Sequence, residues 1–470
     1  DYAISASGGT EKVSYLLSGN YISQEGVIPV DGFKKYSARV KVEYRPTDRV
    51  TFGVNLAPNL STITGADNQN WFGNLYAQSA LLPPIIPIRN PDGSFGMGAD
   101  VNGLNSPAAN PLEVANLLTD TEDIFRMLGG ISLTVEPIDG LIFKSTISTN
   151  IGTNDSQRVY NPPVDNRARA GYSIIGQLNL SKSQQIGWLN ENTVNYKRLF
   201  GNHAFEVLGG FTLQRDHFES LVSNVQDLQI QGPTLLSLGD RNTLTSFNTV
   251  TENSLVSYLG RLNYSYKDRY LVTGTVRNDG SSRFGADNRS QTFGSFALGW
   301  RLSEEAFIQQ LGFVDEAKIR GSYGSTGSNA IPDFIAKSCL APVNHAFGGV
   351  PVTGVSISSP GNPNLTWETS TQLDIGLDAT LYGGRLNLVL DYYNNETTSL
   401  LLSRNLVPSS GYTGFLTNIG SMRNKGVEVS LNAKVIDTED IEWSEETLPI
   451  MIKRFLIWVA MMRYVISLVL

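Results

Sequence analysis

The residues from Tyr36 to Arg45 alternate strictly between apolar and polar side chains. Tyrosine, alanine and valine occupy the even positions, and serine, arginine, lysine and glutamate occupy the odd ones. Because a β-strand sends successive side chains to opposite faces, this stretch predicts a strand with one apolar and one charged face. The same alternation returns along most of the chain. It predicts an all-β protein, either a soluble sandwich or a membrane barrel.

The alternation predicts about fourteen strands, whose ends are uncertain by a few residues. Most come as neighbouring pairs, which favours an antiparallel sheet. The predicted strands are 13–21, 36–45, 50–56, 127–135, 141–150, 193–198, 204–214, 257–267, 270–277, 296–302, 319–323, 373–381, 386–392 and 427–435.

The lengths of the connections favour the membrane barrel. If successive strands run up and down, the short turns all fall at one end, and Ser303–Glu316, with a possible short helix, falls there too. The other end receives the long irregular segments, about 58–125, 152–188, 216–254, 324–368 and 401–424. Outer-membrane barrels have this asymmetry between short and long connections. Five tyrosines mark the short-turn end, where an aromatic girdle is expected: Tyr44, Tyr196, Tyr266, Tyr270 and Tyr382.

The two faces differ in charge as a barrel requires. The apolar faces are nearly free of Lys and Arg, which cost about 2–4 kcal/mol each at the bilayer midplane. The opposite faces suit a wet interior and carry Arg39, Lys41, Glu43, Arg261, Asp374, Asp378, Asp391 and Glu428. Up to about residue 447 the chain has no run of 18 apolar residues, so strands are the only predicted means of crossing a membrane.

Composition excludes several classes of function. Charged residues make up 17% of the 470 residues and the net charge is −8, which does not suit nucleic-acid binding. The single Cys339 excludes an internal disulfide and a thiolate metal site. The three histidines lack the spacing of a metal site, and no nucleophile elbow or phosphate-binding loop is present. We therefore predict no enzyme, no cofactor and no metal.

The last stretch, 448–470, departs from the alternation and is predominantly apolar. A membrane helix is one interpretation, although Lys453, Arg454 and Arg463 divide the apolar run. We favour a frameshift or assembly artefact that begins after Trp443. The predicted organisation is a partial outer-membrane barrel over 1–447 and an aberrant tail over 448–470.

Several motifs in order resemble one known family. They include GRLNYSYKDRYLVTGTVRNDGSSRFGADNR from Gly260, SFALGWRLSEEAF from Ser295 and IRGSYGSTGSNAI from Ile319. A second set is GNPNLTWETSTQLDIGLDATLYGGRLNLVLDYYNNETTSLLL from Gly361 and SSGYTGFLTNIGSMRNKGVEVSL from Ser409. Together they resemble the barrel of SusC/RagA-type TonB-linked outer-membrane transporters, over about residues 5–440.

The resemblance implies a barrel of about 22 strands in the outer membrane of a Gram-negative, Bacteroidetes-like cell. It also implies an N-terminal plug, energy from the TonB complex, import of an oligosaccharide or peptide, and a SusD-like surface lipoprotein as partner. Against that pattern the plug and its TonB-contacting region are missing. About fourteen of the 22 strands are present, so the expected fold is a partial antiparallel transmembrane β-barrel.

Substrate contacts are expected in the long loops. Trp71, Phe72 and Tyr76 lie in a segment rich in Asn and Gln, a combination that suits sugar rings and their hydroxyls. The alternative is that these aromatics pack the loop against its neighbours. Asn278, Asp279 and Gly280 are turn formers, and their segment, Arg277–Gly285, is predicted to shape an outer turn.

Three other functions stay open at this point. A siderophore or cobalamin receptor would use the same architecture, and a passive porin would have no plug. A soluble β-rich surface-binding protein would bury its apolar strand faces between two sheets.

Overall fold

The computed structural model describes residues 1–28, 30–65, 75–96, 110–162, 176–230, 232, 234–437, 442–447 and 450–455. The chain divides into two compact units. Unit 1 comprises Asp1–Leu133, Thr146–Leu189 and Asp216–Glu252. Unit 2 comprises Thr134–Ser145, Asn190–Arg215 and Asn253–Leu470. Both are built from antiparallel strands, as the alternation predicts.

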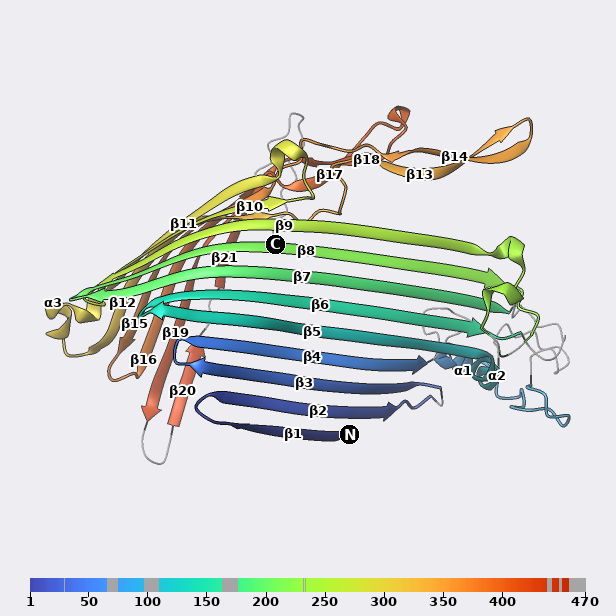
Figure 1. The fold of residues 1–470 in the computed structure, drawn as a ribbon, viewed down its shortest axis with the longest axis horizontal. Helices are drawn as coiled ribbons and strands as arrows, with labels where there is room; N and C mark the ends of the chain where they lie inside the picture. Colours follow the sequence, from blue (N-terminus) through green and yellow to red (C-terminus); the bar gives the residue numbers. More distant parts are fainter. Residues whose placement is uncertain are drawn as a thin grey trace. The chain divides into compact units, whose positions relative to one another are not determined.

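Unit 1 begins with four strands that pair antiparallel in chain order (Figure 1). They are β1 (Tyr2–Gly9), β2 (Val13–Glu25), β3 (Gly32–Thr47) and β4 (Val50–Gly65). Two short helices follow, α1 (Leu75–Leu81) and α2 (Pro111–Leu117). None of the helices in the described ranges is long and apolar enough to cross a membrane.

Five long strands each contribute a segment to both units. They are β5 (Leu118–Ile138), β6 (Leu141–Tyr160), β7 (Gln177–Phe200), β8 (His203–Gln226) and β9 (Thr245–Tyr266). They are far longer than predicted, so 216–254 is not the continuous irregular segment that was expected. A membrane crossing needs only about 9–11 residues. We attribute the error to strand ends that have polar residues on both faces, where the contrast between odd and even positions disappears.

Unit 2 continues the antiparallel pairing in the order β9, β10, β11, β12, β15, β16, β19 (Figure 1). The new strands are β10 (Tyr270–Ser281), β11 (Ser290–Arg301), β12 (Val314–Ser328), β15 (Glu368–Leu381), β16 (Leu386–Thr398) and β19 (Ser421–Asp437). Two further strands, β20 (Glu442–Thr447) and β21 (Ile450–Phe455), pair with β19.

Short helical turns complete the described chain. The connection from β11 to β12 holds η5 (Leu302–Glu304) and α3 (Ala306–Gln309), which confirms the short helix expected there. The remaining turns are η2 (Leu236–Leu238), η3 (Arg241–Thr243), η4 (Ala286–Asn288) and η6 (Pro408–Ser410).

All fourteen predicted strands are present among the described residues, as β2 to β12, β15, β16 and β19. The prediction missed β1, β20, β21 and two hairpins in long connections. The hairpins are β13 (Cys339–Phe347) with β14 (Val350–Ser359), and β17 (Leu401–Asn405) with β18 (Gly414–Asn418). In the stretch 448–470, residues 450–455 form β21, whereas 448–449 and 456–470 lie outside the described residues. The artefact interpretation of this stretch stays a prediction.

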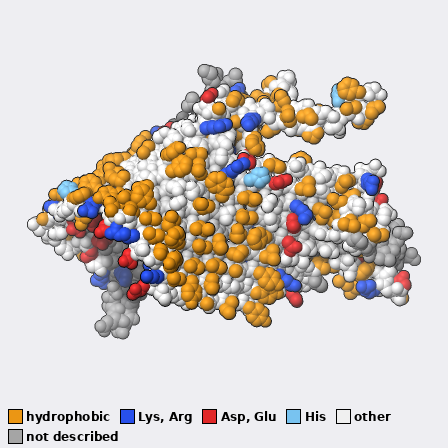
Figure 2. Space-filling model, in the orientation of Figure 1, with side chains coloured by type: hydrophobic (Ala, Val, Ile, Leu, Met, Phe, Trp, Pro, Cys, Tyr) orange, Lys and Arg blue, Asp and Glu red, His pale blue; other side chains and the backbone are white. Residues whose placement is uncertain are grey.

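The apolar side of the strands is exposed in both units. Figure 2 shows hydrophobic side chains along the strands of one face, with charged side chains nearer the strand ends. Exposed fractions on this apolar face run from 39% to 60% at Leu17, Tyr44, Phe52, Ile131, Phe143, Ile147, Val276, Phe296, Leu298, Ile319, Ile375, Leu390 and Val427. A soluble sandwich would cover these side chains with a second sheet.

Buried apolar clusters occur instead at the long-connection ends of the strands. In unit 2 the cluster contains Phe284, Phe293, Ile331, Leu365 and Trp367. In unit 1 one cluster joins the β2–β3 connection to both helices, and another joins the ends of β6, β7 and β8. The described residues thus bury apolar side chains in the connections and expose them along the strands.

Candidate functional site

The polar face of unit 2 carries side chains that are hydrogen-bonded from strand to strand. Glu206 on β8 accepts from Asn195 on β7 at 3.0 Å and from Asn263 on β9 at 3.4 Å. The Thr273 hydroxyl on β10 donates to the side-chain oxygen (Oδ1) of Asn263 at 3.0 Å. Side chains on four strands are therefore linked in one row, which gives the polar face a fixed pattern of donors and acceptors.

Arg320 on β12 forms an ion-pair clamp across two further strands. Its Nε donates to Asp378 Oδ2 on β15 at 3.0 Å, and its Nη2 donates to Asp391 Oδ2 on β16 at 2.9 Å. Gly376 lies between Arg320 and Asp391 in the strand register. A Cβ at Gly376 would lie 2.5 Å from both Arg320 Cζ and Asp391 Oδ1, so glycine leaves the room that the clamp needs.

The sequence interpretation found both aspartates but missed Arg320. The signal was available, because Ile319 and Tyr323 on the apolar face put residue 320 on the polar one. Which aspartates Arg320 contacts depends on the strand that lies beside β12 and on its register. The pairing of β12 with β15 was not predicted.

A hollow of about 670 Å³ opens on the polar face beside the clamp. Its polar lining includes Arg277, Asp279, Gln372 and Asp374. Arg277 Nε donates to Asp279 Oδ1 at 2.7 Å, so the guanidinium and this carboxylate are already paired. Gln372 donates to Asp374 Oδ1 at 3.1 Å. The hollow therefore offers amide, carboxylate and guanidinium groups, which suit a ligand rich in hydroxyls or amides.

A smaller hollow of about 280 Å³ adjoins the first and also uses Asp374. It adds Lys318 and Arg320 to the lining. The outer turn expected over Arg277–Gly285 forms in the second half of that segment, just after β10 ends at Ser281. Asn278, Asp279 and Gly280 were wrongly expected to form it, because all three lie within β10. The alternation of the strand places Asp279 on the polar face, where it bonds Arg277.

Trp367 lines the larger hollow, but its ring is not free to stack on a ligand. Trp367 is 5% exposed and packs on Phe284 and Phe293, with ring centroids 5.2 and 5.8 Å apart. Its indole nitrogen donates to the Arg289 carbonyl oxygen at 2.9 Å. Trp367 thus holds the long connections together.

The three predicted substrate-contacting residues are only partly described. Trp71 and Phe72 lie outside the described residues. Tyr76 lies on α1 and is 60% exposed, so its ring is accessible. Its role in substrate contact stays a prediction.

The short-turn end of unit 2 gathers aromatic side chains, as the tyrosine positions predict. Tyr270 lies 6.3 Å from Tyr266 and 6.2 Å from Trp300, measured between ring centroids. Glu305, in the β11–β12 connection, accepts from the Tyr270 hydroxyl at 2.7 Å and from Trp300 Nε1 at 3.1 Å. These two hydrogen bonds stabilise the ionised carboxylate and lower the pKa of Glu305 below its usual value. The bond from the Tyr270 hydroxyl has the larger effect, and the bond from Trp300 acts in the same direction.

Within the described ranges, no group of three or more His, Cys, Asp or Glu side chains is placed to hold a metal ion. The polar side chains of the two hollows bind one another or face solvent.

The fold and its two unlike faces define a class of outer-membrane β-barrel. Residues 31–460 match the family model of the TonB dependent receptor-like β-barrel, and the chain belongs to this family. The resemblance to its SusC/RagA-type members is confirmed by the relatives below.

The relatives share nearly all of this chain but only part of their own length. TonB-dependent receptor P26 of Formosa agariphila is 36% identical over 94% of this chain and 44% of its own length. SusC of Bacteroides thetaiotaomicron is 28% identical over 94% of this chain and 45% of its own. The RagAB peptide transporter structure has a TM-score of 0.78 at 25% identity, over 96% of this chain and 51% of the other. The chain thus spans about half the length of these relatives.

Membership confirms three expectations from the sequence. The fold is that of an antiparallel outer-membrane barrel domain, and the location is the outer membrane. The family consists of receptors for transport, so the chain is not an enzyme.

Proposed function

We propose that this protein imports an oligosaccharide or a peptide across the outer membrane, driven by the TonB complex. The supporting observation is the division between the two strand faces. The apolar face is exposed and suits hydrocarbon, whereas the polar face carries linked hydrogen-bonding groups and suits a wet interior. The TonB contact is part of the proposal, because the matched length covers about half of each relative.

The relatives and the polar hollow support the proposed substrate class. The RagAB structure is described as a peptide transporter, and SusC is a curated relative. Amide, carboxylate and guanidinium groups in the hollow can meet the hydroxyls of a glycan or the amides of a peptide. The likeness to the siderophore receptor PirA, at 14% identity and a TM-score of 0.52, is one of fold alone. It does not favour a siderophore or cobalamin.

The two remaining alternatives have less support. A soluble surface-binding protein would need its apolar strand faces covered, and they are exposed. A passive porin would work without TonB, whereas the family is that of TonB-dependent receptors.

The β13–β14 hairpin supports a partner on the long-connection side. Its two strands expose apolar side chains on both faces, with Leu340, Phe347 and Val355 each 67–70% exposed. An isolated two-stranded hairpin is marginally stable in water, and exposed apolar patches mark interaction sites. We assign this hairpin to the SusD-like surface lipoprotein that the family resemblance implies.

Uptake by cells tests the transport proposal. A deletion strain and its complemented parent are compared for growth on single oligosaccharides and single peptides. We expect the deletion to abolish growth on one substrate class, and loss of TonB to have the same effect. Unchanged growth on every substrate would contradict import, and uptake that persists without TonB would favour the porin.

Copurification tests the partner. The variant Phe347→Ser/Val355→Ser should lose the SusD-like lipoprotein encoded beside the gene, because it removes apolar contact area. The control Phe247→Ser changes a side chain that is 70% exposed in β9 and should retain the lipoprotein. Equal recovery with both variants would contradict a role for the hairpin.

A further inference from the structure

The two hollows on the polar face of unit 2 form one trough. They share Ala297 of β11, Ser322 of β12 and Asp374 of β15 in their linings. The larger hollow continues toward the long connections, where Trp367 lines it. The smaller hollow continues toward the short turns, where Lys318 lines it. Asp374 therefore lies at the junction of the two hollows, and Lys318 lies toward one end of the trough.

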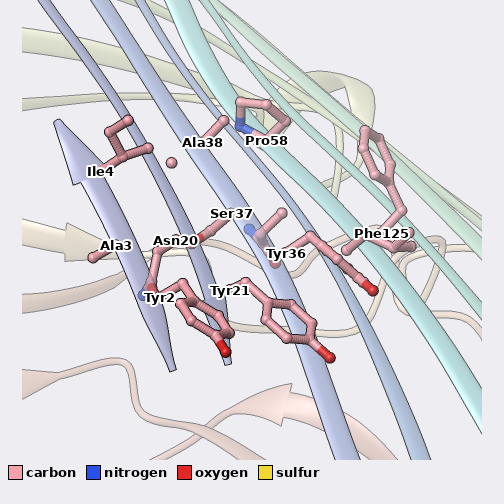
Figure 3. A pocket seen from close by; sticks show the side chains of 13 residues that line it. Tyr2, Ala3, Ile4, Asn20, Tyr21, Tyr36, Ser37, Ala38, Pro58 and Phe125 are labelled. Carbon is pink, nitrogen blue, oxygen red and sulfur yellow. The ribbon is translucent and has the colours of Figure 1, made fainter. Parts of the chain in front are cut away.

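A hollow on the apolar face of unit 1 differs from the trough in its charge. It has a volume of about 530 Å³, and its lining includes Tyr21, Tyr36 and Phe125 (Figure 3). Among the described residues that line it, none is Lys, Arg, Asp or Glu. The charged side chains that line the trough are Arg277, Asp279, Lys318, Arg320 and Asp374. Ionic recognition of a ligand is thus a property of the trough.

Three of these five charged side chains are already paired. Arg277 Nε lies 2.7 Å from Asp279 Oδ1, so each neutralises the other. Arg320 is held between the carboxylates of Asp378 and Asp391. The charges of Arg277, Asp279 and Arg320 are therefore used within the protein.

Asp374 and Lys318 have no ionic partner within the described part of the chain. Asp374 accepts a hydrogen bond from the neutral amide of Gln372 at 3.1 Å. Lys318 lies opposite Asp378 in the register, but its Cε extends over β11, 3.3 Å from where a Cβ on Gly299 would lie. Both side chains are half-buried. Because a partly desolvated charge without a partner is costly, a ligand of opposite charge would be stabilising at each.

The surrounding charges leave these two sites distinct. Arg261 on β9 donates to Thr275 at 3.3 Å on one side of the trough. Glu428 on β19 lies opposite Asp391 in the register on the other side. The excess negative charge of the Arg320 clamp is on β15 and β16, whereas the end of Lys318 extends the other way, over β11. An anion can therefore reach Lys318 from the β11 side, away from the two aspartates.

The spacing of the two charges matches a short extended peptide. Asp374 pairs with Ser322, and Lys318 precedes Ser322 by four residues on the same face of β12. Four residues of a strand span about 13 Å. An extended peptide of three or four residues spans about 10–14 Å. A chain of neutral sugars offers no charge to either residue.

We propose that the trough binds both ends of a short peptide, with the α-ammonium group at Asp374 and the α-carboxylate at Lys318. The inference rests on the proposed import function and selects the peptide from its two substrate classes. Every unmodified peptide carries these two end charges. Recognition by Asp374 and Lys318 is therefore independent of the peptide's side chains and sensitive to its length.

Binding of tetra-alanine to the purified protein in detergent tests the proposal. Calorimetry compares the free peptide with its N-acetylated and its C-amidated forms. Each modification removes one end charge and should weaken binding to the parent about tenfold. Asp374→Asn should weaken binding of the free peptide to the same extent and leave binding of the N-acetylated form unchanged. Lys318→Gln should weaken the free peptide likewise and leave the C-amidated form unchanged.

Two control variants change charges of the polar face outside the trough. Glu428→Gln and Lys41→Gln should leave the affinity for every form of the peptide as in the parent. Failure of free tetra-alanine to bind the parent would overturn the proposal, as would equal affinity for the free and modified peptides. Binding of maltotetraose in place of the peptide would overturn the choice of a peptide and leave import intact. Import itself is contradicted only by unchanged growth of the deletion strain.

Discussion

Apolar side chains are exposed in the middles of the strands, whereas a cluster of them is buried in the long connections. Phe296, in the middle of β11, is 51% exposed, whereas Phe284, in the β10–β11 connection, is 2% exposed. The two residues are only twelve positions apart in the sequence. The difference indicates two solvents: the connections fold against water and need a core of their own, whereas the strand faces meet hydrocarbon and need none.

The largest expected effect is in the connections. Phe284→Ala should leave a cavity in the cluster with Trp367 and Leu365, which costs about 3–5 kcal/mol of local stability for a buried Phe. Hydrogen exchange and limited proteolysis of the long connections measure this loss. Phe347→Ala, at a side chain 67% exposed, should cost under about 0.5 kcal/mol. Equal protection in the two variants would contradict a packed cluster.

The next largest effect is on the strand face. Phe296→Arg places a cation near the middle of the apolar band and should cost about 2–4 kcal/mol of folding free energy in lipid. Its neighbour Ser295 lines the larger polar hollow, so Ser295→Arg should fold nearly as well as the parent. Denaturant titration in liposomes compares the two. If Ser295→Arg were the costlier change, the assignment of the two faces would be wrong.

The clamp on the polar face should give a smaller effect. Arg320→Gln leaves Asp378 and Asp391 without the cation that separates them, and we expect a loss of about 1–2 kcal/mol, between the values for exposed and buried pairs. The triple variant Arg320→Gln/Asp378→Asn/Asp391→Asn should recover most of this loss in the same titration. No recovery would mean that Arg320 acts by packing and not by charge.

The smallest effect is a pH dependence at the short-turn end. Because the pKa of Glu305 is lowered in the folded protein, its ionised form adds stability at pH values above its unfolded pKa of 4.5. That contribution is lost as the pH falls through the lower folded pKa. The stability difference between the parent and Glu305→Gln should therefore be constant near neutral pH and vanish in acid. A difference that grows toward low pH would contradict this sign.

Much of the fold could be predicted because the membrane enforces a contrast between odd and even positions. All fourteen alternating segments are strands in the described chain. The outer parts of β5 to β9 were missed where no hydrocarbon imposes that contrast. β1 was missed because YAISASGG consists largely of small side chains, which give weak alternation.

The candidate site was less predictable than the fold. Individual polar residues such as Asp374 and Asp378 could be placed on the correct face, because alternate positions along a strand face opposite sides. The Arg320 clamp and the polar hollow depend on the register between strands far apart in the sequence, such as Ser322 opposite Asp374. Single-strand patterns carry no information about that register. Trp71 and Phe72 lie outside the described residues, so their predicted role is untested.

The most direct test of the account is to measure which solvent each strand face meets. Single cysteines at Phe296 and Ser295, in a background with Cys339→Ser, are labelled with a polarity-sensitive fluorophore in native membranes. We predict that the label at 296 is quenched by spin-labelled lipid and that the label at 295 is not. Quenching of the label at 296 by a water-soluble ion, without quenching by lipid, would contradict the contact with hydrocarbon on which the account depends.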